Sequence, residues 1–194
     1  KEKKSLFKNF FNKNKIREIS DVNDSSFLKE LKSLNPSLFI VAGFPQIFKK
    51  DLLKIPSHGA LNLHAGPLPK YRGGSPLNWQ LINGEKNIGI SIIKMKEGID
   101  NGNIIESEYF ERNQNDTIAD LHKKANQIFP FLTIKAIQKL LDGFNGFVQE
   151  ESKAIYWHQR NDEDGFLNLK KNSTDILLFI KALTHPYKGA WTYY

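Results

Sequence analysis

The chain contains no cysteine among its 194 residues. It therefore has no disulfide, no thiolate nucleophile and no cysteine-ligated zinc, and a reducing compartment is permitted but not required. The sequence also lacks an apolar run of the roughly 18 to 20 residues that span a bilayer. The opening segment, KEKKSLFKNFFNKNK, is too polar for the apolar region of a signal peptide. We expect a soluble, cytoplasmic protein whose chemistry relies on nitrogen and oxygen groups.

The composition is that of an ordinary globular protein, with 40% hydrophobic and 25% charged residues. This length suits one sizeable domain with a small appendage. The net charge of +7 favours anionic partners such as nucleotides, phosphates or RNA, but lysines spread over solvated faces give the same total. The basic opening segment, with its interleaved phenylalanines, could bind nucleic acid or form an amphipathic surface helix.

Strand and helix patterns alternate along the chain, which predicts an α/β fold. A helix capped by Asp24 or Ser25 is expected over FLKELKSL, and a second, ending at Gly84, over PLNWQLINGE. The segments expected to form strands are KIREI, LFIVAGF, ALNLHA, GISIIKM and NIIESEYF. The apolar run LFIVAGF is typical of a strand that is buried on both faces, as in a parallel sheet.

The second half of the chain begins with a long helical pattern. Thr117 and Asp120 have the spacing of a capping box, Pro130 predicts a kink, and Gly143 should end the helix. A strand is then expected over FVQEESKAIYW and a helix over DILLFIKAL. We place a core domain at residues 1–146 and a C-terminal linker and small subdomain at 147–194.

Asn62, His64 and Asp100 are the candidate catalytic residues. Residues two apart in a strand point to the same side, so Asn62 and His64 can project into one cleft. An amide donor, an imidazole and a carboxylate can together promote attack on a carbonyl and hold the resulting oxyanion. Asp100 lies between two glycines and could instead be a turn residue. The other histidines, His58, His122, His158 and His185, are interpreted as structural.

The loop that follows His64, GPLPKYRGGSP, is rich in proline and glycine. Such a loop is stiff, and its lack of bulk lets a substrate approach the backbone closely. A plain surface turn is the alternative.

The segment NLHAGPLPKYRGGSPLNWQLINGEKNIGISIIKMKEGIDNGNII resembles the formyltransferase fold family, and within it the sugar N-formyltransferases. The positions that match the family pattern are Asn62, His64, Leu68, Pro69, Gly98, Asp100 and Gly102. The resemblance covers roughly residues 15 to 110 and continues more weakly into RNDEDGFLNL and ALTHPYKGAWTYY. It implies a Rossmann-like core with a mostly parallel sheet and a small C-terminal α+β region. The strand, helix and strand with which family members open are not found in this chain.

The resemblance also implies a formyl donor, N10-formyltetrahydrofolate, and no metal. The residues expected around the pterin are Phe44, Pro45, Gln46, Ile47, Lys96, Glu97 and Gly98. The loop Ala65-Gly66-Pro67-Leu68-Pro69 is similar to that of sugar N-formyltransferases, so the expected acceptor is a nucleotide-linked amino sugar, dTDP or UDP, with a dTDP-4-amino-4,6-dideoxyhexose preferred. The candidate acceptor-binding residues are Gly66, Arg72, Tyr187 and Trp191, although Arg72 could equally tie down its own loop and the aromatics could fill a small core.

The expected mechanism assigns Asn62 to the oxyanion. His64 either accepts the proton of the amine or donates to the oxyanion, and Asp100 either orients the ring or relays a proton through water to the folate nitrogen. The resemblance to sugar N-formyltransferases implies a role in surface polysaccharide (O-antigen) synthesis and a homodimer. We expect no nucleic acid partner and no membrane association. The rivals are methionyl-tRNA formylation and a non-catalytic folate or nucleotide-sugar binding module.

Overall fold

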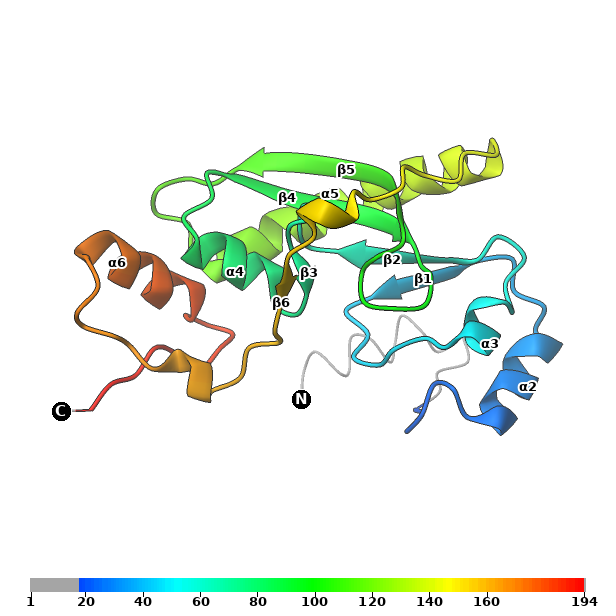
Figure 1. The fold of residues 1–194 in the computed structure, drawn as a ribbon, viewed down its shortest axis with the longest axis horizontal. Helices are drawn as coiled ribbons and strands as arrows, with labels where there is room; N and C mark the ends of the chain where they lie inside the picture. The colour runs from blue at the N-terminus through cyan, green and yellow to red at the C-terminus, as the bar shows by residue number, and fades with distance from the viewer. Residues whose placement is uncertain (1–17, 194) are drawn as a thin grey trace.

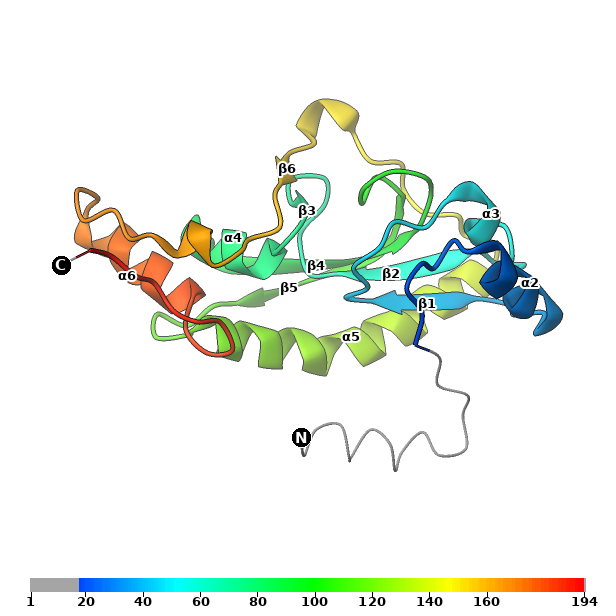
Figure 2. The ribbon, with the colours of Figure 1, turned by 90° about the horizontal axis from the view of Figure 1, so that it is seen from below.

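A computed structural model describes residues 18–193 of the chain. The expected amphipathic helix in the opening segment, and most of the expected strand KIREI, lie outside the described residues. Figure 1 shows a central sheet with helices at both ends, and Figure 2 shows the two faces of this sheet from the side.

The central sheet has four strands in the order β1 (Phe39–Ala42), β2 (Ala60–His64), β4 (Asn87–Lys94) and β5 (Asn103–Glu111). The α/β class is confirmed, but β1 and β2 form the single parallel pair of this sheet, and β2 with β4 and β4 with β5 are antiparallel. The expectation of a mostly parallel sheet is therefore wrong for the described residues. Six consecutive residues of β4 are buried because both faces of this strand are covered, and such a run looks the same in either strand direction.

Helix α5 (Ile118–Leu141) packs along one face of the sheet (Figure 2). Its first turn has the predicted capping box, in which the Asp120 carboxylate accepts hydrogen bonds from the backbone N–H and the hydroxyl of Thr117. The helix runs continuously across Pro130 and ends before Gly143, whose φ of +87° suits glycine. The buried residues of α5 are Ile118, Leu121, Ala125, Phe129, Leu132, Ala136 and Leu140, which follow the helical period.

The opposite face carries the short strands β3 (Arg72–Gly73) and β6 (Tyr156–Trp157), which pair in parallel, and the 3₁₀ turn η1 (Glu151–Lys153) (Figure 2). The strand expected over FVQEESKAIYW is thus wrong for most of its length. Phe147 makes a single bridge to Ile104, after which the chain leaves the sheet. The alternating pattern of FVQEESKAIYW has another cause, because Gln149 and Glu151 turn toward Arg72 rather than toward a neighbouring strand.

The remaining helices lie at the two ends of the sheet (Figure 1). Helices α2 (Ser25–Ser33) and α3 (Lys50–Leu53) lie beside β1, and Asp24 caps α2 as predicted. Helix α4 (Pro76–Ile82) packs against α6 (Ser173–Ala182), which follows the 3₁₀ turn η2 (Glu163–Gly165). Ala182 belongs to the same core cluster as Leu77 and Leu81. The separation of residues 147–194 as a subdomain stays a prediction.

The main core lies between α5, β4 and α4, and a smaller one, built on Val22, Val41, Phe48 and Leu52, lies under the α2 end. Within residues 18–193, no helix is long and apolar enough to cross a membrane.

Leu121→Ala should lower the free energy of unfolding by about 2 to 5 kcal/mol, because it opens a cavity where the side chain is fully buried. Ile134→Ala on the same helix is the control, since Ile134 is 66% exposed and its truncation should change stability by less than about 0.5 kcal/mol. Urea unfolding of both variants measures the difference, and equal losses would contradict the packing described.

Candidate active site

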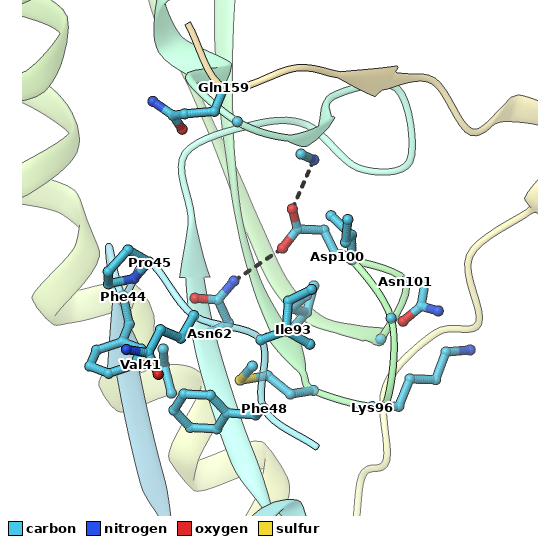
Figure 3. Close-up of a pocket in the computed structure, with 18 of the residues that line it drawn as sticks. Val41, Phe44, Pro45, Phe48, Asn62, Ile93, Lys96, Asp100, Asn101 and Gln159 are labelled. Atoms are coloured by element: carbon cyan, nitrogen blue, oxygen red, sulfur yellow. Dashed lines mark hydrogen bonds between the residues drawn. The ribbon is translucent and has the colours of Figure 1, made fainter. Parts of the chain in front are cut away.

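The Asp100 carboxylate joins three separate parts of the chain. One oxygen, Oδ1, accepts a hydrogen bond from the Asn62 side-chain amide at 3.2 Å. The other, Oδ2, accepts from the backbone N–H of Gly73 at 2.9 Å and lies 3.5 Å from Nδ1 of His64. Figure 3 shows Asp100 between Asn62 and this backbone nitrogen. The three candidate catalytic residues therefore converge, as the sequence predicted.

Asn62 and His64 reach Asp100 from one strand. Both lie on β2, two residues apart, and their side chains leave the same face of the sheet. Asp100 comes from the loop between β4 and β5, where its φ of +47° is a left-handed conformation that few residues other than glycine adopt. This unusual backbone directs the carboxylate toward β2.

Both nitrogens of the His64 ring face hydrogen-bond acceptors. Nε2 lies 2.5 Å from the Tyr71 carbonyl oxygen, so it must carry hydrogen, while Nδ1 faces the Asp100 carboxylate. A proton on Nδ1 would allow this nitrogen to donate to the carboxylate. His64 is buried, so its influence on the site passes through its contact with Asp100.

Gly66 leaves the space that this histidine occupies. A Cβ at this position would lie 2.9 Å from His64 Nε2 and 2.9 Å from the Tyr71 Cβ. A larger residue here would displace the ring or the Tyr71 backbone that holds it. The glycine-rich loop is thus packed against the site rather than being a plain surface turn.

A cavity of about 480 Å³ opens beside Asn62 and Asp100, a size that suits a small organic ligand. Apolar side chains such as Val41, Phe48 and Ile93 form one wall, and the loop around Asp100 forms another (Figure 3). The predicted pterin-binding residues that line it are Phe44, Pro45, Gln46, Ile47, Lys96 and Gly98. Glu97 is not among the lining residues, and its carboxylate accepts a hydrogen bond from the backbone N–H of Lys50.

The loop that carries Phe44 to Ile47 is held by the segment before α2. The Gln46 amide accepts a hydrogen bond from the Val22 N–H and donates one to the Ser20 carbonyl. Asn23 donates to the Ile47 carbonyl at 2.9 Å. The cavity wall therefore depends on contacts between two loops.

The sequence interpretation missed a third wall, formed by Gly73, Gly74, Trp157, His158 and Gln159. The glycine pair was the available signal, because it allows another backbone to come close. A Cβ at Gly73 would lie 2.1 Å from the Trp157 carbonyl oxygen, and one at Gly74 would lie 2.3 Å from the Gln159 Cα. His158, interpreted as structural, lines the cavity and also pairs with Asp164 at 3.0 Å.

Trp157 is fixed by rings on both sides. Tyr71 stacks on it at a centroid distance of 5.7 Å, Trp79 lies 4.7 Å away on a tilted plane, and the indole N–H donates to the Lys70 carbonyl. The Trp157 side chain is therefore held in place by its neighbours.

Comparison with known proteins identifies the family of this chain. Residues 1–137 match the model of the family described as formyl transferase. The chain belongs to this formyltransferase family.

Two kinds of formyltransferase are similar to this chain. The methionyl-tRNA formyltransferase of Thermodesulfovibrio yellowstonii is 35% identical over 172 residues, which are 89% of this chain and 56% of that protein. The chain thus spans about half the length of that curated relative. The crystal structure of an N-formyltransferase from Helicobacter canadensis, in complex with folinic acid and dTDP-3-aminofucose, matches with a TM-score of 0.71 and 27% identity, over 90% of this chain and 62% of that one. The structure of WlaRD, a sugar 3N-formyltransferase in the presence of dTDP and 5-N-formyl-THF, matches with a TM-score of 0.68 and 25% identity, over 90% and 61% of the two chains.

Arg72, nominated as an acceptor-binding residue of this chain, is fully buried on β3. Its guanidinium donates to Glu151 at 2.8 and 2.9 Å, to Gln149 and to the Tyr156 hydroxyl. The hydrogen bonds with Glu151 and Tyr156 raise the pKa of Arg72 further. That Arg72 binds a phosphate stays a prediction, and the Glu151 ion pair would have to open for it.

Tyr187 and Trp191, the other nominees, do not line the cavity beside Asn62 and Asp100. The Tyr187 hydroxyl donates to the Asn78 side chain at 3.2 Å, and burial raises the pKa of Tyr187. The Trp191 indole N–H donates to the Asp162 carbonyl, and its ring packs on Phe166. Both aromatics are 40% exposed, so a stacking role stays a prediction.

Among residues 18–193, no group of three or more His, Cys, Asp or Glu side chains could hold a metal ion.

Tyr71 gives the site a pH-dependent contribution to stability. Burial, with the neighbouring Glu85 carboxylate, raises the pKa of Tyr71 from its ordinary value of 10.0 to about 12. The unfolded state ionises first, so the contribution is complete below about pH 10 and is lost as the pH rises toward 12. Urea unfolding between pH 9 and pH 11.5 should show a steeper loss for wild type than for Tyr71→Phe. Parallel curves would contradict this origin.

Proposed function

We propose that this protein transfers a formyl group from N10-formyltetrahydrofolate to the amine of a nucleotide-linked amino sugar. The observation that carries the proposal is the cavity in which Asn62 and Asp100 open onto six of the seven predicted donor-binding residues. The Asn62 amide and the Asp100 carboxylate would then be available to the formyl group of a donor held in this cavity.

The cavity fits the donor in size and chemistry. Its apolar walls suit the faces of a flat heteroaromatic ring, and the exposed backbone of the Phe44 to Ile47 and Lys96 to Gly98 loops supplies polar groups for the ring edge. The folate, when bound, supplies an activated formyl carbon. All the other steps fall to residues of this chain.

Asn62 would stabilise the charge that develops on the formyl oxygen. Its amide has two N–H groups, and one of them donates to Asp100. Because an ionised carboxylate only accepts, this bond turns the nitrogen rather than the oxygen of the amide toward the site, and the second N–H is available to the formyl oxygen.

Asp100 and His64 would manage the proton. The attacking amine forms the new C–N bond and loses a proton, while the folate nitrogen leaves the formyl carbon and gains one. Asp100 faces the cavity and can accept and return that proton, directly or through water. The buried His64 ring supports the carboxylate from behind through Nδ1, so its role is electrostatic and orienting.

Two observations support a sugar acceptor. The loop Ala65 to Pro69 is similar to that of sugar N-formyltransferases, and the similar Helicobacter canadensis enzyme was crystallised with dTDP-3-aminofucose. Methionyl-tRNA is the second candidate, because the 35% identical curated relative is a methionyl-tRNA formyltransferase. A non-catalytic binding module is the third, and it predicts ligand binding without product.

An acceptor panel separates these candidates. With N10-formyltetrahydrofolate, the full-length protein should formylate one or more of the dTDP- and UDP-linked 3-amino and 4-amino sugars, and mass spectrometry should detect the replacement of one amine hydrogen by a formyl group. Formylation of methionyl-tRNA instead would move the function to the second candidate. Folate binding without any product would leave only the binding module.

Asn62→Ala should lower kcat by about 10² to 10³-fold, because one oxyanion donor is lost. The Kd for 5-formyltetrahydrofolate should change only a few-fold, since the donor loops are intact. Asn87→Ala, an exposed asparagine at the start of β4, is the matched control and should retain wild-type kcat. A near-normal kcat for Asn62→Ala would remove this residue from the mechanism.

A further inference from the structure

Gln149 is a buried amide that lies behind the site rather than in it. Only 7% of the residue is exposed, although the chain around it runs over the surface. Its Nε2 donates to the backbone carbonyls of Asp100 at 2.7 Å and Gly102 at 2.6 Å, and its Oε1 accepts from Arg72 Nε at 2.9 Å. Both donors and one acceptor site of this amide are therefore used.

The orientation of this amide is fixed by its partners. Two backbone carbonyls can only accept and a guanidinium can only donate, so the nitrogen must face the loop and the oxygen must face Arg72. A reversed amide would place an oxygen against two carbonyl oxygens. The hydrogen bonds thus specify glutamine rather than glutamate here.

The loop held by Gln149 has a backbone that needs holding. Asp100 has a φ of +47°, a conformation that costs a non-glycine residue free energy and persists only where its surroundings maintain it. The carbonyl on which Gln149 acts belongs to Asp100 itself. If the peptide rotated, the carboxylate would leave Asn62 and the Gly73 N–H.

Gln149 is in turn anchored from the other side. Arg72 lies on β3, next to Gly73, and its remaining N–H groups donate to Glu151 and Tyr156. The Gly73 N–H meets the same Asp100 carboxylate. A closed ring therefore runs from Gln149 through Arg72 and β3 to Asp100 and back.

We propose that Gln149 is a positioning residue, which holds the backbone of Asp100 so that its carboxylate meets Asn62, His64 and Gly73. The inference rests on the proposed function, in which Asp100 handles the proton. Gln149 touches neither the cavity nor a reacting atom, so its effect passes through Asp100.

Gln149→Glu tests this proposal by changing one side of the amide. The glutamate keeps the acceptor for Arg72, as an ion pair, but presents an oxygen to the two loop carbonyls. If Gln149 served Arg72 alone, kcat would stay at the wild-type value. We expect kcat to fall by about 10- to 100-fold, the effect of a displacement of about 1 Å at a catalytic group. Gln127→Glu on the exposed face of α5 makes the same change and should leave kcat unaltered.

A double-mutant cycle distinguishes positioning from a general loss of structure. In an Asp100→Ala background, Gln149→Glu should lower the residual rate by less than about 2-fold, because the group through which it acts is gone. An equal loss in both backgrounds would overturn the proposal, as would an unaltered kcat in the first. Gln149→Met, which removes both donors without adding a charge, should reproduce the result if the glutamate variant is poorly folded.

A crystal structure of Gln149→Glu or Gln149→Met supplies a readout that needs no turnover. The Asp100 φ should leave the left-handed region and the Asn62 to Asp100 hydrogen bond should open. Retention of both would overturn the positioning role even in an active enzyme. If wild type formylates no acceptor, the proposed function fails while this structural test still decides the role of Gln149.

Discussion

The site depends on one carboxylate that accepts two hydrogen bonds and lies beside the His64 ring. Asp100 meets the Asn62 amide, the Gly73 backbone N–H and the His64 ring, which belong to β2 and β3, while Asp100 itself follows β4. These contacts hold the carboxylate beside the cavity that Asp100 lines. Because acceptor-only oxygen dictates the orientation of each partner, the charge of Asp100 organises the amide and the ring together.

The sheet explains why this convergence is possible. Strands β2 and β4 are antiparallel neighbours, so the turn after β4 returns beside the start of β2 rather than near His64, and the loop must reach back over the sheet to the site. Asp100 makes that reach with a left-handed backbone, between Gly98 at φ +111° and Gly102, where a Cβ would lie 2.1 Å from the Lys94 carbonyl oxygen. The glycines on each side therefore let the loop close, and Asp100 carries the strain between them.

Much of this could be predicted from the sequence, because local rules decide it. The four central strands, the caps at Asp24 and Thr117, and the pairing of Asn62 with His64 on one strand face all follow from period and capping chemistry. Strand direction could not be predicted, since a strand buried on both faces has the same composition whether its neighbours are parallel or antiparallel. The wall that contains Trp157 was also missed, because Gly73 and Gly74 indicate that another backbone segment comes close but do not identify that segment.

Arg72 shows how little the type of a residue says about its surroundings in the fold. A guanidinium beside a glycine-rich loop suits a phosphate, yet in the fold it is fully buried and bonded to Gln149, Glu151 and Tyr156. A buried guanidinium needs such partners, because the free-energy cost of removing its charge from water is offset only when its N–H groups are hydrogen-bonded and the charge is paired. The partners come from a segment some 80 residues away in sequence, with separations of 77, 79 and 84 residues, so local pattern could not reveal them. Under the role proposed for Gln149, Arg72 would also contribute to the geometry of Asp100, because its Nε donates to the Gln149 side-chain oxygen.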